Sequence, residues 1–118
     1  MAWRAQTKAD LRWFEKLPCA MEVCDEKYNI LYMNERAAEV NREAGGESLV
    51  GKNLMDCHKP ESQKKLREMI ASGKPNIYTV EKKGVKKLVS QSPWRRNGKV
   101  AGLLEITFEL PKDLPNHK

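Results

Sequence analysis

The sequence predicts one α+β domain, a five-stranded antiparallel sheet with helices on one face, preceded by an amphipathic N-terminal helix. The order of the segments carries this prediction. Two short alternating segments come first, helical segments follow, and three further alternating segments complete the chain. Asn97-Gly98 separates the last two alternating segments, and this dipeptide is the strongest short signal for a hairpin turn.

The first half of the chain is predicted to contain a helix, a hairpin and a second helix. Residues 3–16 carry apolar side chains at helical spacing. Residues 19–24 and 30–33 alternate in character and flank a polar turn, so they are predicted to pair as a hairpin. Asn34 is a favourable N-cap for a helix over residues 35–43, which two glycines then end.

The second half is predicted to contain one longer helix and three strands. Pro60 suits the first turn of a helix that runs to about Ser72. Leu66, Met69 and Ile70 recur at i, i+3 and i+4 along it, which is the spacing of a face packed on a core. The three strands are predicted over residues 77–82, 85–94 and 100–110.

Composition argues against several classes of protein. The net charge of +6 is compatible with nucleic-acid binding. The basic residues are spread along the chain, however, and aromatic residues do not interleave with them as a base-stacking surface requires. A basic nucleic-acid binder is therefore the least favoured of the functions considered for this chain.

No segment approaches the ~20 apolar residues that span a bilayer. The start of the chain lacks the apolar core of a signal peptide, so we expect a cytoplasmic protein with reduced cysteines.

Several motifs follow one another in an order that resembles the PAS domain family. They are Leu17-Pro18 with Val23-x-Asp25, the runs 30–38 and 49–54, and Ser90-x-Ser92-Pro93 with the final hairpin. The resemblance covers about residues 17–110 and leaves residues 1–16 as the N-terminal helix and 111–118 as a polar tail. The frequent Asp-Ile-Thr ending of the family is absent here, because Glu105-Ile106-Thr107 stands in its place.

The resemblance implies a strand order of 2-1-5-4-3 and a ligand cavity between the sheet and the middle helices. It also implies that the protein forms a homodimer or binds a signalling partner protein, with the N-terminal helix as the contact surface. The alternative is that this helix only covers the open face of its own sheet. The candidate dimer residues are Trp3, Leu11, Trp13 and Phe14. The candidate cavity residues are Met21, Val23, Met33, Ala37, Val40, Leu54, His58, Leu66, Met69, Ile70, Tyr78 and Leu104.

The first strand is expected to turn Met21 and Val23 toward the cavity. Because side chains alternate along a strand, Glu22 would then point to the far side of the sheet. There it would form an ion pair at an interface or remain solvated.

The resemblance makes two cofactors relevant, flavin and haem. Flavin-binding members that sense light have a reactive cysteine where this chain has Leu54, so flavin is not expected. His58 is the only histidine outside the C-terminal tail, and it is the candidate axial ligand for haem. A capping or hydrogen-bonded His58 is the alternative. Cys19 and Cys24 are five positions apart in one predicted strand, so their side chains would point to opposite faces of the sheet. This arrangement argues against a zinc site that uses both.

We therefore predict a small stand-alone PAS-type sensor that binds a small molecule and signals through dimer or partner contacts. One alternative is a ligand-free dimerisation or protein-interaction module. Another is a haem sensor that uses His58. No nucleophile or acid/base constellation is apparent in the sequence, so enzyme activity is not expected.

Overall fold

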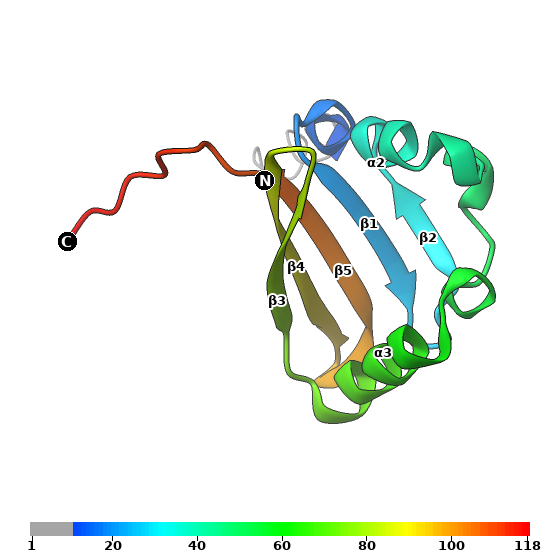
Figure 1. Cartoon of the computed structure of the whole chain (residues 1–118). Helices are drawn as coiled ribbons and strands as arrows, with labels where there is room; N and C mark the ends of the chain where they lie inside the picture. The colour runs from blue at the N-terminus through cyan, green and yellow to red at the C-terminus, as the bar shows by residue number, and fades with distance from the viewer. Residues whose placement is uncertain (1–10) are drawn as a thin grey trace, which may run out of the picture.

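The computed structural model describes residues 11–118 and shows one five-stranded antiparallel sheet, which confirms the predicted fold class. Its strands lie in the order β2-β1-β5-β4-β3, the order implied by the resemblance (Figure 1). The strands are β1 (Ala20–Asp25), β2 (Ile30–Met33), β3 (Asn76–Lys82), β4 (Val85–Arg96) and β5 (Lys99–Glu109). The α-helices are α2 (Glu35–Val40) and α3 (Pro60–Ser72), and 3-10 helices cover Leu11–Lys16, Arg42–Ala44, Gly46–Leu49 and Leu54–Cys57.

The first part of the N-terminal helix predicted over residues 3–16 lies outside the described residues. Trp3 lies there too. Its described part, Leu11–Lys16, is a 3-10 helix and not the α-helix expected there. Such geometry is common in short helical pieces, in which each hydrogen bond spans three residues and not four. Pro18 follows two residues later and prevents regular continuation.

The helix predicted over residues 35–43 is shorter than expected. α2 ends at Val40, and a 3-10 helix at Arg42–Ala44 follows it. Asn41 explains the early end, because its Nδ2 group donates to the Ala37 carbonyl at 2.8 Å and its backbone N–H donates to the same oxygen. Asparagine side chains that bond nearby backbone groups compete with helix continuation in this way.

α3 has the bounds that the sequence predicts. Pro60 lies in its first turn, and Gly73 ends it in the left-handed conformation with φ of 70°. The backbone N–H of Gly73 donates to the Met69 carbonyl, which satisfies one of the free carbonyl groups at the helix end.

Asn34 is the N-cap of α2, as predicted, and it has a second role that the sequence did not reveal. Its side chain is fully buried. Its Oδ1 atom accepts from the N–H groups of Ala37 at 2.9 Å and Met21 at 3.0 Å. Its Nδ2 group donates to the carbonyls of Phe14 at 3.0 Å and Cys19 at 2.9 Å. One amide therefore joins α2, β1 and the N-terminal 3-10 helix.

Gly102 of β5 lies where β1 and β4 leave no room for a side chain. A Cβ atom at this position would come within 1.9 Å of the Cys24 carbonyl oxygen and 2.7 Å of Trp94 Nε1. The absent side chain lets the Trp94 indole reach across β5, and its Nε1–H donates to the Cys24 carbonyl at 3.1 Å.

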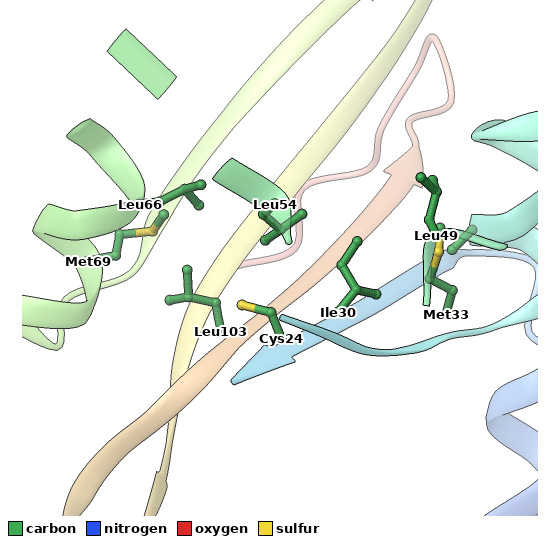
Figure 2. Close-up of a cluster of buried hydrophobic side chains, with 9 residues drawn as sticks. Cys24, Ile30, Met33, Leu49, Leu54, Leu66, Met69 and Leu103 are labelled. Carbon is green, nitrogen blue, oxygen red and sulfur yellow. The ribbon is translucent and has the colours of Figure 1, made fainter. Parts of the chain in front are cut away.

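The hydrophobic core lies between the sheet and the helical segments. Figure 2 shows Leu66 and Met69 of α3 beside Leu103 of β5 and Cys24 of β1. The helix packs on the sheet through the face that the i, i+3 spacing predicts. The buried cluster consists of Cys24, Ile30, Met33, Ala37, Leu49, Leu54, Leu66, Met69 and Leu103.

Beyond β5 the chain has no further helix or strand. Residues 111–118 are exposed and extend away from the sheet (Figure 1). Within residues 11–118, no helix combines the length and the apolar character that crossing a bilayer requires.

Candidate functional site: the cavity between the sheet and the helices

A cavity of ≈ 320 Å³ lies between the sheet and the helical segments. This volume is at the lower end of the ~300–1,000 Å³ typical of small-molecule sites. The apolar part of its wall includes Cys24, Ile30, Leu49, Leu54, Leu66 and Leu103. The polar part consists of Glu22, Asn41, His58, Gln91 and Glu105. A mixed wall of this kind can hold an apolar body and orient a polar group.

The cavity adjoins an outer groove between α3 and β3. His58, Leu66 and Glu105 are among the residues that line both the cavity and the groove. Lys65 on α3 and Tyr78 on β3 line the groove and not the cavity. The groove and the cavity therefore share part of their walls.

A row of polar side chains crosses the sheet beneath the cavity. Asn76 of β3 donates through Nδ2 to Oε1 of Gln91 on β4 at 3.0 Å. Gln91 in turn donates through Nε2 to Oε2 of Glu105 on β5 at 2.7 Å. Glu22 of β1 is the cross-strand neighbour of Glu105. All four side chains share one face because directly paired residues of neighbouring strands lie on the same side of a sheet.

Glu22 occupies an electrostatically unfavourable position in this row. Burial is the main cause that raises its pKa to about 7, and the nearby Glu105 carboxylate adds to the effect. Among the described residues, Glu22 has no hydrogen-bond or ion-pair partner for its side chain. Near neutral pH, the Glu22 carboxyl group therefore exchanges readily between its protonated and ionised forms.

Glu22→Gln is expected to raise the free energy of unfolding by about 2–3 kcal/mol at pH 8 and by under about 1 kcal/mol at pH 5. The folded protein keeps the Glu22 proton up to about pH 7, whereas the unfolded chain loses it near the ordinary value of 4.5. The wild-type protein therefore loses stability as the pH rises from about 4.5 to 7, and the neutral amide removes that loss. Urea unfolding at both pH values measures the difference.

The control for this variant is Glu26→Gln, which removes an exposed carboxylate in the turn after β1. We expect it to change stability by less than about 0.5 kcal/mol at either pH. An equal effect of Glu22→Gln at pH 5 and pH 8 would show that the Glu22 carboxyl group is not the titrating group.

His58 lies on the cavity wall with its ring fixed by one hydrogen bond. Its Nδ1 atom is 2.7 Å from the Leu54 carbonyl oxygen, which can only accept, so Nδ1 carries the proton. The Nε2 atom of the neutral ring is then an acceptor that is free to bind a ligand. Within residues 11–118, no group of three or more His, Cys, Asp or Glu side chains is arranged to hold a metal ion.

Haem fits this site only in part. The tautomer of His58 suits an axial ligand, because Nε2 carries the free electron pair. The sheet wall does not suit the macrocycle, because Glu22 and Glu105 present carboxyl groups where a haem would need an apolar face. Haem ligation by His58 stays a prediction.

Cys24 contributes an apolar surface to the cavity and no reactive group. Burial raises the pKa of its thiol to about 11, so the sulfur stays protonated at neutral pH. Cys57 also lines the cavity, and its Sγ–H donates to the Leu54 carbonyl at 3.5 Å.

The structure distributes the candidate cavity residues over several environments. Leu54, His58 and Leu66 line the cavity. Leu104 borders it too, but its pairing with Val23 puts its side chain on the far side of the sheet. Tyr78 lines the outer groove, and Val40 lines a separate pocket of ≈ 70 Å³ next to α2. Four further candidates, from β2, α2 and α3, pack within or against the hydrophobic core: Met33, Ala37, Met69 and Ile70.

β1 has the opposite orientation to the one expected. Glu22 lines the cavity and Cys24 belongs to the core, so alternation turns Met21 and Val23 to the far side of the sheet. The expectation failed because both faces of β1 carry apolar residues, and the charge at Glu22 suggested an outward position. The position of Glu22 on the cavity wall and the burial of Cys24 in the core reveal the true orientation.

The candidate dimer residues that the structure describes lie in the N-terminal 3-10 helix. Leu11 begins this helix, and Trp13 is 51% exposed within it. Phe14 is half-buried. Homodimerisation through this helix stays a prediction.

The polar row is the part of the site that sequence reasoning missed. Gln91 and Glu105 are separated from Glu22 by at least 69 positions in the chain, so only strand pairing brings them together. The resemblance supplied the strand order, but it did not supply the register of the strands.

The chain matches a family model described as "PAS fold" over residues 14–110. No curated protein matches it in sequence. A sensory box sensor histidine kinase from Vibrio cholerae is similar in structure, with 18% identity and a TM-score of 0.59, covering 94% of this chain and 99% of that one.

Two further structures are similar in fold. VqmA bound to DPO, a protein of Vibrio cholerae, has 20% identity and a TM-score of 0.66, covering 87% of this chain and 57% of that one. The Aer2 receptor from Vibrio cholerae, described as a dual PAS-heme oxygen sensor, has 18% identity and a TM-score of 0.61, covering 79% of this chain and 95% of that one. At these identities the likeness shows a shared fold.

Proposed function

Because the chain belongs to the PAS fold family, we propose that it is a sensory module that binds a small molecule in the cavity between the sheet and α3. The observation that carries the proposal is the polar row of Glu22, Glu105, Gln91 and Asn76 beneath a cavity of ≈ 320 Å³. A sheet that served only as a packing surface would present apolar side chains there, because burying polar groups costs free energy.

Signalling in this proposal runs through the N-terminal segment. Asn34 joins the cavity strand β1, through the N–H of Met21, to the 3-10 helix Leu11–Lys16, through the carbonyl of Phe14. Ligand occupancy would shift the balance between two arrangements of the helical segments over the sheet. A second copy of the chain, or a partner protein, would receive the change through the exposed Trp13 surface.

The site supports binding and not catalysis in this proposal. The buried Cys24 thiol stays protonated, and the exposed Cys57 sulfur donates to a backbone carbonyl. His58 also directs its Nδ1 proton to a backbone carbonyl and not to an adjacent catalytic side chain. A ligand-free interaction module is the second candidate, and it is favoured by the exposure of Trp13.

The proposal is tested by thermal unfolding of the full chain against a library of small organic molecules. A true ligand raises the melting temperature with its concentration, and at one hundred times Kd it adds about 2.7 kcal/mol. Leu54→Phe fills part of the cavity and is expected to abolish the rise. The matched control is Leu31→Phe, at a position on β2 that is 49% exposed, and it should leave the rise intact.

Two results would contradict ligand binding in the cavity. One is a library in which no molecule raises the melting temperature, which would favour the interaction module. The other is a rise that Leu54→Phe preserves, which would place binding elsewhere on the protein.

A further inference from the structure

The cavity differs in charge from the rest of the molecule. The whole chain has a net charge of +6. Yet among the described residues that line the cavity, the ionisable side chains are Glu22, Glu105, His58 and two cysteines, with no lysine or arginine. The formal negative charge of the wall comes from the two glutamates.

The cations near these glutamates lie outside the cavity. Lys65 and Lys82 line the outer groove, which Glu105 also borders. Arg36 of α2 and Lys87 of β4 line the small pocket on the other side of Glu22 and Glu105. The Arg36 guanidinium pairs with Glu39 at 3.1 Å and with Glu109 at 3.6 Å. Among the described residues, neither Glu22 nor Glu105 forms an ion pair.

Within the polar row, only one of the two carboxyl groups accepts a hydrogen bond. Glu105 accepts from Gln91 Nε2 at 2.7 Å, which holds its carboxylate in place. Glu22 receives no such bond, and its raised pKa reflects burial beside a like charge. A donor placed between the two groups would relieve the repulsion and give Glu22 a hydrogen bond that the row does not supply.

We propose that the ligand of this cavity is a small organic cation, in which a protonated amine or amidine lies between the carboxylates of Glu22 and Glu105 and an apolar body packs on Leu54, Leu66 and Leu103. The inference rests on the proposed function, because it concerns the same cavity. Charge-assisted hydrogen bonds to two carboxylates are among the strong ones in proteins. The apolar wall accounts for the rest of the molecule.

Binding of such a cation is coupled to the ionisation of Glu22. At low pH the carboxyl group is protonated and carries no charge, whereas the amine keeps its own charge. Affinity for the cation therefore rises with pH through the region of pH 7. Other charged or titratable groups border the same space. Glu105, Glu109, Arg36 and Lys87 line the small pocket with Glu22, His58 lines the cavity, and Lys65 and Lys82 line the outer groove.

The test compares matched probes with the full chain at pH 8. The cations are benzylamine and cyclohexylamine, and their counterparts are benzyl alcohol, benzoate, cyclohexanol and cyclohexanecarboxylate. We expect at least one amine to bind at least tenfold more tightly than its alcohol and its carboxylate, measured by calorimetry or by NMR titration. Glu22→Gln and Glu105→Gln should each weaken the amine at least tenfold, and Glu26→Gln should not change it.

The outcomes separate this inference from the proposed function. If only alcohols or carboxylates bind, and Leu54→Phe abolishes their binding, the cavity takes a ligand but the cation is wrong. If no probe and no library molecule binds, both proposals are wrong. If an amine binds equally well to the protein with Glu22→Gln and at pH 5, the carboxylates do not hold it and the inference is overturned.

Discussion

Replacing Asn34 by alanine is expected to lower the free energy of unfolding by about 3–5 kcal/mol. The side chain is fully buried and makes four hydrogen bonds to backbone groups. Alanine removes all four partners at once and leaves two N–H groups and two carbonyls unpaired in the interior. Each unpaired buried group costs about 1–3 kcal/mol, and the sum is reduced where water or a small shift restores a bond.

The size of this loss is large against the ~5–15 kcal/mol that stabilises a typical domain. Urea unfolding of the wild-type and variant chains measures it. Asn34→Asp separates the two roles of the amide, because a carboxylate still accepts from Met21 and Ala37 but cannot donate to Phe14 and Cys19. Stability of Asn34→Ala within about 1 kcal/mol of wild type would show that the surrounding groups find other partners.

Gly102→Ala is expected to cost about 3 kcal/mol or more. The added Cβ atom would lie 1.9 Å from the Cys24 carbonyl oxygen, and no side-chain rotation can relieve a contact between two backbone-attached atoms. β1 and β5 must separate, which disturbs the pairing of Gly102 with Asp25. Thermal or urea unfolding measures the loss.

The matched control is Gly84→Ala in the turn between β3 and β4. A Cβ atom there meets nothing within 4 Å, and the cost comes only from the positive φ of 79°. That cost is about 1–2 kcal/mol. If Gly102→Ala destabilised the protein no more than Gly84→Ala, the close approach of β5 to β1 would not be rigid.

Most of the fold could be predicted because its signals are local. Asn97 and Gly98 adopt φ values of 52° and 78°, as the turn between two paired strands requires. Pro60 and Gly73 delimit α3 through backbone preferences that act within one turn of the helix. The strand order, by contrast, came from the family resemblance, since no local pattern states which strands are neighbours.

The chemistry of the site could not be predicted in the same way. The alternation of β1 predicts Glu22 on the far side of the sheet and fails there, because alternation determines relative orientation but not which face is buried. The hydrogen bond from Gln91 to Glu105 depends on the register of β4 and β5. Such pairings follow from the three-dimensional arrangement of strands that are distant in the sequence.

The hydrogen bond from Trp94 to the Cys24 carbonyl gives the protein an intrinsic optical reporter. The indole lies against the backbone of β1, and the side chain of the same Cys24 lines the cavity. Tryptophan emission depends on the hydrogen bonding and polarity around the ring, so movement of β1 beneath the cavity changes the spectrum of Trp94. Replacing Trp3 and Trp13 by phenylalanine isolates that signal, and occupancy can then be followed by fluorescence without an added dye.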